Sequence, residues 1–440
     1  MRLRIVIFIC RLSRTILKHF NRGSSMPGKI ALFLYPNILK KIKLPEITIA
    51  VTGSNGKTST VEMINEILTQ AGYSVAYNSE GSNQIDGIAT TILTNCDYSG
   101  SFDKDVLLME SDERYAQYTF KYFSPKYFVI TNLFRDQMTR NGNPEYVLSQ
   151  VQKAINKDMK LVINADDPLI ATLANENTCL FGINENLYSK DENNYIYDDG
   201  YYCPKCKSKL VYDYRQFGHV GSYHCSNCDF TRGKLNYFVS EIYLNKKEIV
   251  INNGYKVNLA FDSIYNIYNI LASFAVSNLV GVDPSIIVSS INNYLIKNGR
   301  IINFKLGNNR GLLLISKHEN SVSYNQNIEY ITSQKKNCAV ILIVDSISRK
   351  YFTSDTSWLW DINFESLKND YIDEIVVTGQ YSADIAERLE YAGIDMSKVY
   401  IDKNIKPALK YASDIDNKFI YTLTCFSDEN KFLNRTGATW

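Results

Sequence analysis

The feature that most constrains the fold is a glycine-rich loop at residues 52–60, Thr-Gly-Ser-Asn-Gly-Lys-Thr-Ser-Thr. An apolar run at 47–51 precedes it, and residues 61–68 follow with the apolar spacing of a helix. A loop of this kind between a strand and a helix directs backbone N–H groups toward an anion at the helix N-terminus. Its lysine can reach the outer phosphates of a nucleotide, and the threonine after it can hold Mg²⁺. The sequence therefore predicts an ATP site.

The predicted nucleotide site consists of residues in and directly after this loop. They are Gly53, Ser54, Asn55, Gly56, Lys57, Thr58 and Ser59. Within this set we expect Lys57 to act catalytically on the transferred phosphoryl group and Thr58 to bind magnesium. The Gly-x-x-Gly-Lys-Thr spacing is two residues shorter between the glycines than the usual phosphate-binding loop. A strand-to-helix turn that binds nothing is the alternative.

Four cysteines form the second pattern. Cys203 and Cys206 make one Cys-x-x-Cys pair, Cys225 and Cys228 make another, and eighteen residues separate the pairs. This is the spacing of a zinc ribbon, in which four thiolates surround the ion and leave no position for a substrate. We therefore expect structural zinc. Unrelated thiols, or a disulfide pair, are the alternatives.

The remaining cysteines indicate the compartment. The total of nine is odd, and five cysteines are scattered without a pattern: Cys10, Cys96, Cys179, Cys338 and Cys425. This usage is typical of a reducing compartment, so a cytoplasmic location is expected. His219 and His224 lie inside the ribbon. Because four cysteines suffice as ligands, both histidines are expected in packing or on the surface.

The chain as a whole is balanced in charge, with 48 Lys and Arg against 46 Asp and Glu, which gives no strong field for nucleic acid or membrane. Residues 1–45 are its one basic region. Its first cations interleave with apolar residues: Arg2, Arg4, Arg11, Arg14, Lys18 and Arg22. Such a helix either rests on an anionic membrane, at the inner face of the plasma membrane, or packs on the ATPase domain. No run reaches the roughly eighteen apolar residues of a spanning helix.

From residue 46 onward, strands and helices alternate. Apolar runs at 105–109, 127–131 and 161–164 have the pattern of parallel strands buried on both faces. Glu110 directly follows the first of these runs. Since an open α/β sheet binds ligands at the carboxyl ends of its strands, Glu110 is predicted near the nucleotide. A surface glutamate at a strand end is the alternative.

A second α/β domain is predicted after residue 299. Strands are expected at 339–344, 374–378, 399–401 and 419–424, with helices at 382–392 and 405–412. At 440 residues with 45% apolar content, the chain can form two or three domains. The predicted organisation is a basic segment at 1–45, an ATPase domain at 46–297 with a ribbon insertion at 197–238, and a C-terminal domain at 298–440.

With this loop spacing the chain resembles the Mur ligase superfamily, and with the inserted ribbon it resembles the MurT family in particular. Further markers in family order lie at 78–83, 109–113, 131–138, 164–168, 265–269, 298–300 and 355–361. The resemblance implies a Mur ligase-type central P-loop ATPase domain and a Rossmann-like C-terminal domain. It makes 164–168 a nucleotide-proximal loop, which the residues alone predict only as a turn before a helix.

The resemblance also assigns roles to single residues. It implies that Glu110 binds magnesium and acts in catalysis, that Asn269 lies near adenine, and that Arg300 belongs to the active site once the C-terminal domain closes. From the residues alone, Asn269 is more often a solvent-facing helix residue. Arg300 is equally well a charge in a domain linker.

The implied activity is that of a lipid II isoglutaminyl synthase, with ATP, Mg²⁺ and structural Zn²⁺ as cofactors. ATP phosphorylates the α-carboxyl of D-glutamate in the lipid II stem peptide, and ammonia converts the acyl phosphate to D-isoglutamine. No cysteine here has the surroundings of a glutaminase nucleophile. A separate GatD-type glutamine amidotransferase subunit is therefore the implied partner.

Asp355 is the residue that the resemblance assigns to the partner's chemistry. A glutaminase Cys–His pair needs an acid that orients the histidine, and the segment at 355–361 is where the MurT family places it. Asp361 is the second candidate. From the residues alone, Asp355 equally caps a short helix through Ser357 and Trp358.

Two segments depart from the MurT pattern. Residues 345–354 lack the usual Asp-Asn-Ala-Ala-Asp run, and residues 315–322 replace the usual Asn-Pro-Ala-Gly segment. A different acceptor or reduced activity therefore stays open. Two other functions stay open as well: a Mur or folylpolyglutamate-type ligase that adds an amino acid without a glutaminase, and a catalytically inactive binding subunit.

Overall fold

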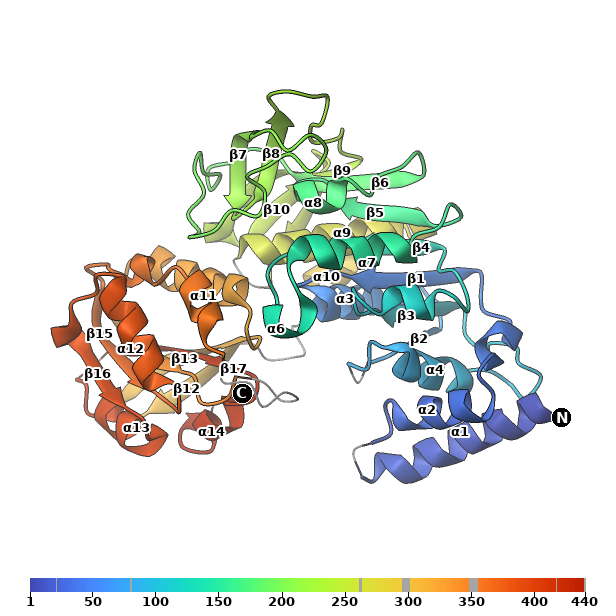
Figure 1. Cartoon of the computed structure of the whole chain (residues 1–440), viewed down its shortest axis with the longest axis horizontal. Helices are drawn as coiled ribbons and strands as arrows, with labels where there is room; N and C mark the ends of the chain where they lie inside the picture. The colour runs from blue at the N-terminus through green and yellow to red at the C-terminus, as the bar shows by residue number, and fades with distance from the viewer. Residues whose placement is uncertain are drawn as a thin grey trace. The chain divides into compact units, whose positions relative to one another are not determined.

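The computed structural model describes the chain apart from residues 21, 80, 261–262, 295–300, 348–354, 417 and 439–440, and apart from the side chains of 139, 437 and 438. The chain forms two compact units (Figure 1). Unit 1 contains Met1–Phe134, Asn143–Asn193 and Asp199–Leu295, and unit 2 contains Arg135–Gly142, Asn194–Asp198 and Ile296–Trp440. Two short segments from the middle of the sequence therefore fold with the C-terminal residues.

Unit 1 is built on a nine-stranded sheet in the order β11-β10-β9-β6-β5-β4-β1-β3-β2. The strands are β1 Ile47–Thr52, β2 Val75–Tyr77, β3 Val106–Glu110, β4 Tyr127–Ile130, β5 Lys160–Asn164, β6 Thr178–Ile183, β9 Tyr237–Tyr243, β10 Glu248–Ile251 and β11 Tyr255–Asn258. The strands from β2 to β9 in this order are parallel, while β10 and β11 are antiparallel at the edge. Since β1 lies between β3 and β4, the sheet has its switch point at the carboxyl end of β1.

Helices cover both faces of this sheet (Figure 1). On one face α3 (Lys57–Gln70), α9 (Ile264–Val280) and α10 (Pro284–Asn292) pack together. On the other face α4 (Ile85–Thr94), α5 (Ala116–Thr119) and α7 (Pro144–Ala154) share one core with the sheet. Every residue of β3 and β4 is buried, which confirms the prediction of strands enclosed on both sides.

The N-terminal segment packs onto this second face. Helices α1 (Arg2–Lys18) and α2 (Met26–Leu34) contact each other and α4, and η1 (Ile38–Lys41) follows them. Val6, Ile7 and Cys10 of α1 join the core of unit 1. The prediction of a helix that packs on the ATPase domain is therefore confirmed. In the described part of the chain, no helix has both the length and the apolar character needed to cross a membrane.

The four-cysteine segment is an insertion between β6 and β9. Its hairpin consists of β7 (Leu210–Phe217) and β8 (Val220–Cys225), paired antiparallel. A small core of its own contains Leu210, Tyr223 and Phe230 together with Cys203 and Cys225. Helix α8 (Pro168–Ala171) and η2 (Leu244–Lys246) are short elements on either side of the insertion.

Unit 2 is an α/β domain with a seven-stranded sheet in the order β16-β15-β14-β17-β13-β12-β18. The strands are β12 Ile301–Leu306, β13 Asn309–Ser316, β14 Cys338–Ile343, β15 Ile372–Thr378, β16 Val399–Asp402, β17 Phe419–Cys425 and β18 Gly437–Ala438. The helices are α6 Met138–Asn141, α11 Ser321–Ser333, α12 Ser382–Tyr391, α13 Ile405–Ser413, α14 Glu429–Leu433, η3 Ser357–Asp361, η4 Phe364–Leu367 and η5 Met396–Lys398. The four strands and two helices predicted here are thereby confirmed, with ends that differ by one or two residues.

The two segments from the middle of the sequence are bonded into unit 2. Arg135 Nη1 lies 2.9 Å from Asp361 Oδ1, and its guanidinium stacks over the Tyr197 ring at 4.2 Å. Gln137 N donates to Glu319 O at 2.9 Å. The hydroxyls of Tyr197 and Ser321 are 3.1 Å apart. Unit 2 is thus completed by residues that precede most of its strands by well over a hundred positions.

Candidate functional site

The glycine-rich loop joins β1 to α3 at the switch point of the unit 1 sheet. Gly53 has a φ of 136° and Gly56 a φ of 85°, in the region that favours glycine. A Cβ added at Gly53 would lie 2.1 Å from Thr131 Oγ1, and one added at Gly56 would lie 2.0 Å from Asn269 Oδ1. Both glycines are therefore required by backbone conformation and by close neighbours. Lys57, Thr58 and Ser59 form the first turn of α3.

Asn132, two residues beyond the end of β4, holds this loop with two side-chain hydrogen bonds. Asn55 N donates to Asn132 Oδ1 at 2.9 Å, and Asn132 Nδ2 donates to Asn55 O at 3.1 Å. In addition, Ser54 N donates to Asn132 O at 2.9 Å, and Thr131 Oγ1 donates to Asn55 O at 2.8 Å. In the sequence, Thr131 and Asn132 belong to the family marker at 131–138, but no role in the site is predicted for them. Their position at the end of a buried strand was the signal that could have found them.

The Asn55 side chain tests whether the loop fits an anion. The residue is 9% exposed, and its Nδ2 is buried with no hydrogen-bond partner in the described part of the chain. A buried donor left unpaired costs about 1–3 kcal/mol, so such a donor is expected to meet an acceptor. A phosphate oxygen at the N-terminus of α3 is an acceptor of this kind.

Lys57 forms an ion pair inside the loop. Its Nζ lies 2.6 Å from Glu113 Oε1, and both side chains are 9% exposed. The same ammonium donates to Gly53 O, which orients it along the loop. Glu113 lies just beyond the end of β3. The chain that follows β3 therefore supplies the negative charge that allows Lys57 to be buried.

The structure brings together the two residues predicted to bind magnesium. Thr58 Oγ1 donates to Glu110 Oε2 at 2.8 Å, and Asn83 Nδ2 donates to Glu110 Oε1 at 3.1 Å. Asn78 fixes the Glu110 backbone, accepting from its N at 2.8 Å and donating to its O at 2.9 Å. Hydroxyl and carboxylate oxygens are the hard ligands that Mg²⁺ prefers, so this pair fits the ion. Glu110 is 6% exposed, so the alternative of a surface glutamate is wrong.

Two further predicted nucleotide residues differ in outcome. Asn269, on α9, is 3% exposed and contacts the loop at Gly56, so the alternative of a solvent-facing residue is wrong. Arg300 lies outside the described residues, as does most of the divergent segment 345–354.

Segment 164–168 is a turn before α8, as the residues alone predicted. Asp167 Oδ1 accepts from Leu169 N at 2.9 Å and caps that helix. Asp166 is fully buried and accepts from Tyr268 Oη at 2.7 Å and from Arg232 Nη1 at 3.1 Å. Burial raises the pKa of this carboxyl. Because Arg232 lies within the insertion, four residues after Cys228, its ion pair with Asp166 ties the insertion to the end of β5.

The four predicted zinc ligands converge on one point. Their Sγ atoms all lie within 4.8 Å of one another, with Cys203–Cys228 at 3.7 Å and Cys206–Cys225 at 3.4 Å. Four thiolates around zinc at about 2.3 Å have Sγ–Sγ separations of about 3.8 Å, so the cluster fits a tetrahedral ion. Lys207, the residue directly after Cys206, has a φ of 66°. His219 is 1% exposed, its Nε2 lies 3.5 Å from Asp167 Oδ1, and it is not part of the four-cysteine cluster. His224 is exposed.

Asp355 lies in unit 2, two residues before the start of η3. Its Oδ1 accepts from Ser357 N at 2.8 Å, which is one of the capping contacts predicted as the alternative to catalysis. Asp361, the second candidate, is paired with Arg135. The catalytic assignment of Asp355 stays a prediction.

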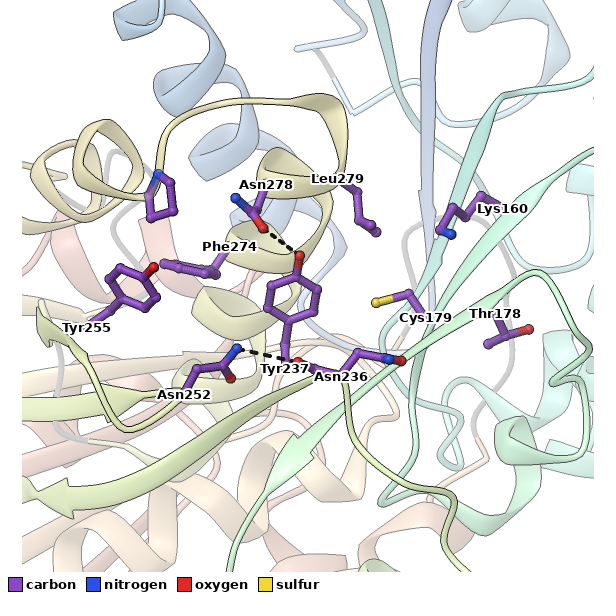
Figure 2. A pocket seen from close by; sticks show the side chains of 11 residues that line it. Lys160, Thr178, Cys179, Asn236, Tyr237, Asn252, Tyr255, Phe274, Asn278 and Leu279 are labelled. Carbon is purple, nitrogen blue, oxygen red and sulfur yellow. Dashed lines mark hydrogen bonds between the residues drawn. The ribbon is translucent and has the colours of Figure 1, made fainter.

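A cavity of about 340 Å³ lies at the opposite, amino-terminal edge of the unit 1 sheet. Lys160, Thr178 and Tyr237, the first residues of β5, β6 and β9, line it (Figure 2). Tyr237 Oη donates to Asn278 Oδ1 at 2.6 Å beside Phe274 and Tyr255. No predicted site residue lines this cavity.

The comparisons with known proteins concern the family and the fold of the chain. The Mur ligase middle domain family matches residues 51–277, and the MurT ligase C-terminal family matches residues 318–428. The MurT subunit of the glutamine-hydrolyzing lipid II isoglutaminyl synthase of Streptococcus pneumoniae is 31% identical over 424 residues, covering 95% of this chain and 93% of the relative. The chain belongs to the MurT family. The MurT subunit of Staphylococcus aureus is 27% identical, with 89% of this chain and 88% of the relative covered.

Solved structures support the Mur ligase fold. A pseudomurein peptide ligase type C from Methanothermus fervidus aligns with a TM-score of 0.69 at 20% identity, covering 91% of this chain and 80% of that one. MurF from Acinetobacter baumannii aligns with a TM-score of 0.63 at 15% identity, covering 92% and 79%. At these identities the likeness concerns the fold alone. The predicted Mur ligase-type α/β fold is therefore confirmed for this MurT family member.

Proposed function

We propose that this MurT family member amidates lipid II, converting the D-glutamate of the stem peptide to D-isoglutamine with ATP as the energy source. The observation that carries the proposal is the loop at 53–58, held by Asn132 and facing Glu110. It occurs in a chain that matches a MurT subunit over 95% of its length. The free cysteines, together with the need for ATP, favour the cytoplasm for this reaction.

The first step makes the carboxylate electrophilic. A carboxylate oxygen attacks the γ-phosphorus of ATP, the bond to the bridging oxygen breaks, and ADP leaves with the electron pair. Lys57 and the loop N–H groups, together with the Asn55 amide, balance the charge of the transferred phosphoryl group. When held by Thr58 and Glu110, Mg²⁺ would neutralise further phosphate charge. In the second step ammonia attacks the acyl carbon, phosphate leaves, and the nitrogen loses a proton to give the amide.

We assign the ammonia supply to a separate GatD-type glutamine amidotransferase subunit. The relatives are subunits of glutamine-hydrolyzing enzymes, which supports a partner of this kind. Asp355 is the candidate acid that would orient the histidine of the partner's Cys–His pair. Its partly exposed side chain lies within the segment that matches the MurT ligase C-terminal family.

Zinc is assigned to the cluster of Cys203, Cys206, Cys225 and Cys228. With four protein ligands the ion has no open position, so it would stabilise the insertion and take no part in the reaction. Asp166 and Arg232 connect the insertion to β5, whose neighbour β4 leads into Asn132. Loss of the metal would therefore disturb the nucleotide site only through the fold.

The test is reconstitution with defined components. Purified chain, Mg²⁺-ATP and lipid II are incubated either with a GatD-type subunit and glutamine or with ammonium at raised pH. We expect both nitrogen sources to replace one hydroxyl of lipid II by an amino group, detected by mass spectrometry, with release of ADP. Incorporation of an amino acid without any glutaminase would instead favour a folylpolyglutamate-type ligase. Failure to bind ATP would favour a binding subunit.

A further inference from the structure

Helix α1 carries a second apolar face that points away from the core. Ile5, Phe8, Leu12 and Ile16 recur at three- and four-residue spacing, so they form one stripe along the helix. They are 48%, 53%, 47% and 51% exposed, whereas Val6, Ile7 and Cys10 on the inner side are buried. A surface helix of a globular protein normally has a polar outer face. We call these four residues the outer stripe.

The outer stripe is held outward by fixed contacts. Arg14 Nη1 donates to Thr94 Oγ1 at 2.6 Å, and Arg11 donates to Cys96 O. Arg2 Nη2 donates to Leu34 O at 2.7 Å at the other end of the helix. These bonds reach α4, the chain just beyond its end, and α2, and they fix the rotation of α1. The outer stripe is therefore a built surface and not one side of a loosely attached helix.

Charge identifies what this surface fits. The first 45 residues contain ten Lys and Arg and no Asp or Glu, whereas the remainder contains 38 Lys and Arg against all 46 acids. Eight of the ten cations are exposed: Arg2, Arg4, Lys18, Arg22, Lys29, Lys40, Lys41 and Lys43. An apolar stripe within a purely cationic segment matches the acyl boundary and the anionic headgroups of a lipid surface. Protein interfaces are instead depleted in lysine.

We propose that α1 lies in the plane of an anionic bilayer surface, with the outer stripe inserted at the headgroup and acyl boundary. The inner face stays packed on unit 1, so the whole unit is carried to the membrane. Insertion is peripheral because α1 has 17 residues and one side of it is occupied by the core. The inference depends on residues 1–45 and holds whether or not the chain amidates lipid II.

Vesicle flotation of the full-length chain tests the proposal. Vesicles of phosphatidylglycerol mixed with phosphatidylcholine are compared with vesicles of phosphatidylcholine alone. The double variant Phe8→Ser with Leu12→Ser removes apolar contact at two exposed positions, so the fold is retained. The matched control is Leu187→Ser, an apolar side chain of unit 1 that is 94% exposed outside this segment. Unchanged thermal unfolding confirms that all variants are folded.

We expect the wild type and Leu187→Ser to float with anionic vesicles, and the double variant to bind at least about tenfold more weakly. Binding should fall on neutral vesicles, in high salt, and after Arg4→Glu with Lys18→Glu. Absence of wild-type binding, or equal binding of wild type and double variant, would overturn the proposal. The proposal would also fail if light scattering showed that the wild type is a dimer and the double variant a monomer, while neither bound vesicles. A second copy of the chain would then cover the outer stripe.

Discussion

Replacing Asn132 with alanine should weaken ATP binding without unfolding the protein. The substitution removes two hydrogen bonds to Asn55, at 2.9 and 3.1 Å. A neutral hydrogen bond contributes about 0.5–1.5 kcal/mol net, so the two together stabilise the loop by about 2 kcal/mol. Both bonds end on one loop residue, so their loss favours an open loop over global unfolding. If only the ordered loop binds nucleotide and the open loop is already well populated without ATP, the ATP dissociation constant rises by up to roughly thirtyfold.

Calorimetric titration with Mg²⁺-ATP measures this effect, and a thermal melt accompanies each variant. The matched control is Asn177→Ala, which removes a single bond of 3.0 Å to Met159 O at the amino-terminal ends of β5 and β6. Its ATP affinity should equal that of the wild type. Asn132→Asp should bind ATP more weakly than the alanine variant, because it sets a carboxylate against Asn55 O and adds negative charge beside the phosphates.

An ATP affinity of Asn132→Ala within about twofold of wild type would refute the reasoning, because it would show that these two bonds do not control the fraction of molecules whose loop can bind nucleotide. A large fall in melting temperature with normal affinity would have the same meaning. In that case the two bonds stabilise the sheet and not the nucleotide site.

Three further predictions concern the ion pair, the metal and the partner. Lys57→Ala should abolish ATP-dependent turnover and lower the melting temperature, because the buried Glu113 carboxylate loses its ion pair with the lysine. Adding Glu113→Gln should restore the melting temperature but not the turnover. Restored turnover would exclude a role for Lys57 in the reaction. Metal analysis should find one zinc per chain, and chelation should make four thiols reactive at mildly alkaline pH. The other five thiols should react only after unfolding, since all of them are buried. Burial also raises the pKa of Cys96, Cys179 and Cys338 to about 11, which leaves little reactive thiolate. A zinc content near zero per chain, or reaction of a fifth thiol before unfolding, would contradict this prediction. In the reconstituted pair, Asp355→Asn should reduce glutamine-driven amidation steeply and spare ammonium-driven amidation, whereas equal loss with both would refute the shared triad.

Local patterns predicted the elements that local physics determines. The loop at 53–58 and the four-cysteine cluster are visible in sequence because their chemistry requires glycine, lysine and cysteine at short fixed spacings. The strands of unit 2 were visible because buried parallel strands form continuous apolar runs. Glu110 was found by the rule that ligands lie at the carboxyl ends of strands.

The partners of these residues were not visible, because they depend on strand order. Asn132 reaches Asn55 across 77 positions, since β4 lies next to β1 on one side. Glu113 reaches Lys57 across 56 positions, since β3 lies next to β1 on the other side. No spacing rule relates such pairs. The same holds for Arg135 and Asp361, which are 226 positions apart.

Unit 2 is made of segments that lie far apart in the sequence, and this limits when it can fold during synthesis. Residues 135–142 and 194–198 leave the ribosome long before the later residues of unit 2 with which they form hydrogen bonds and ion pairs. Arg135 can pair with Asp361, and Tyr197 with Ser321, only after the later residue of each pair has been synthesised. A fragment that begins after residue 300 would lack Arg135, Gln137 and Tyr197, so the C-terminal sequence alone is not an excisable module. Deletion series and domain swaps in this family therefore need boundaries that keep these early residues with the late ones.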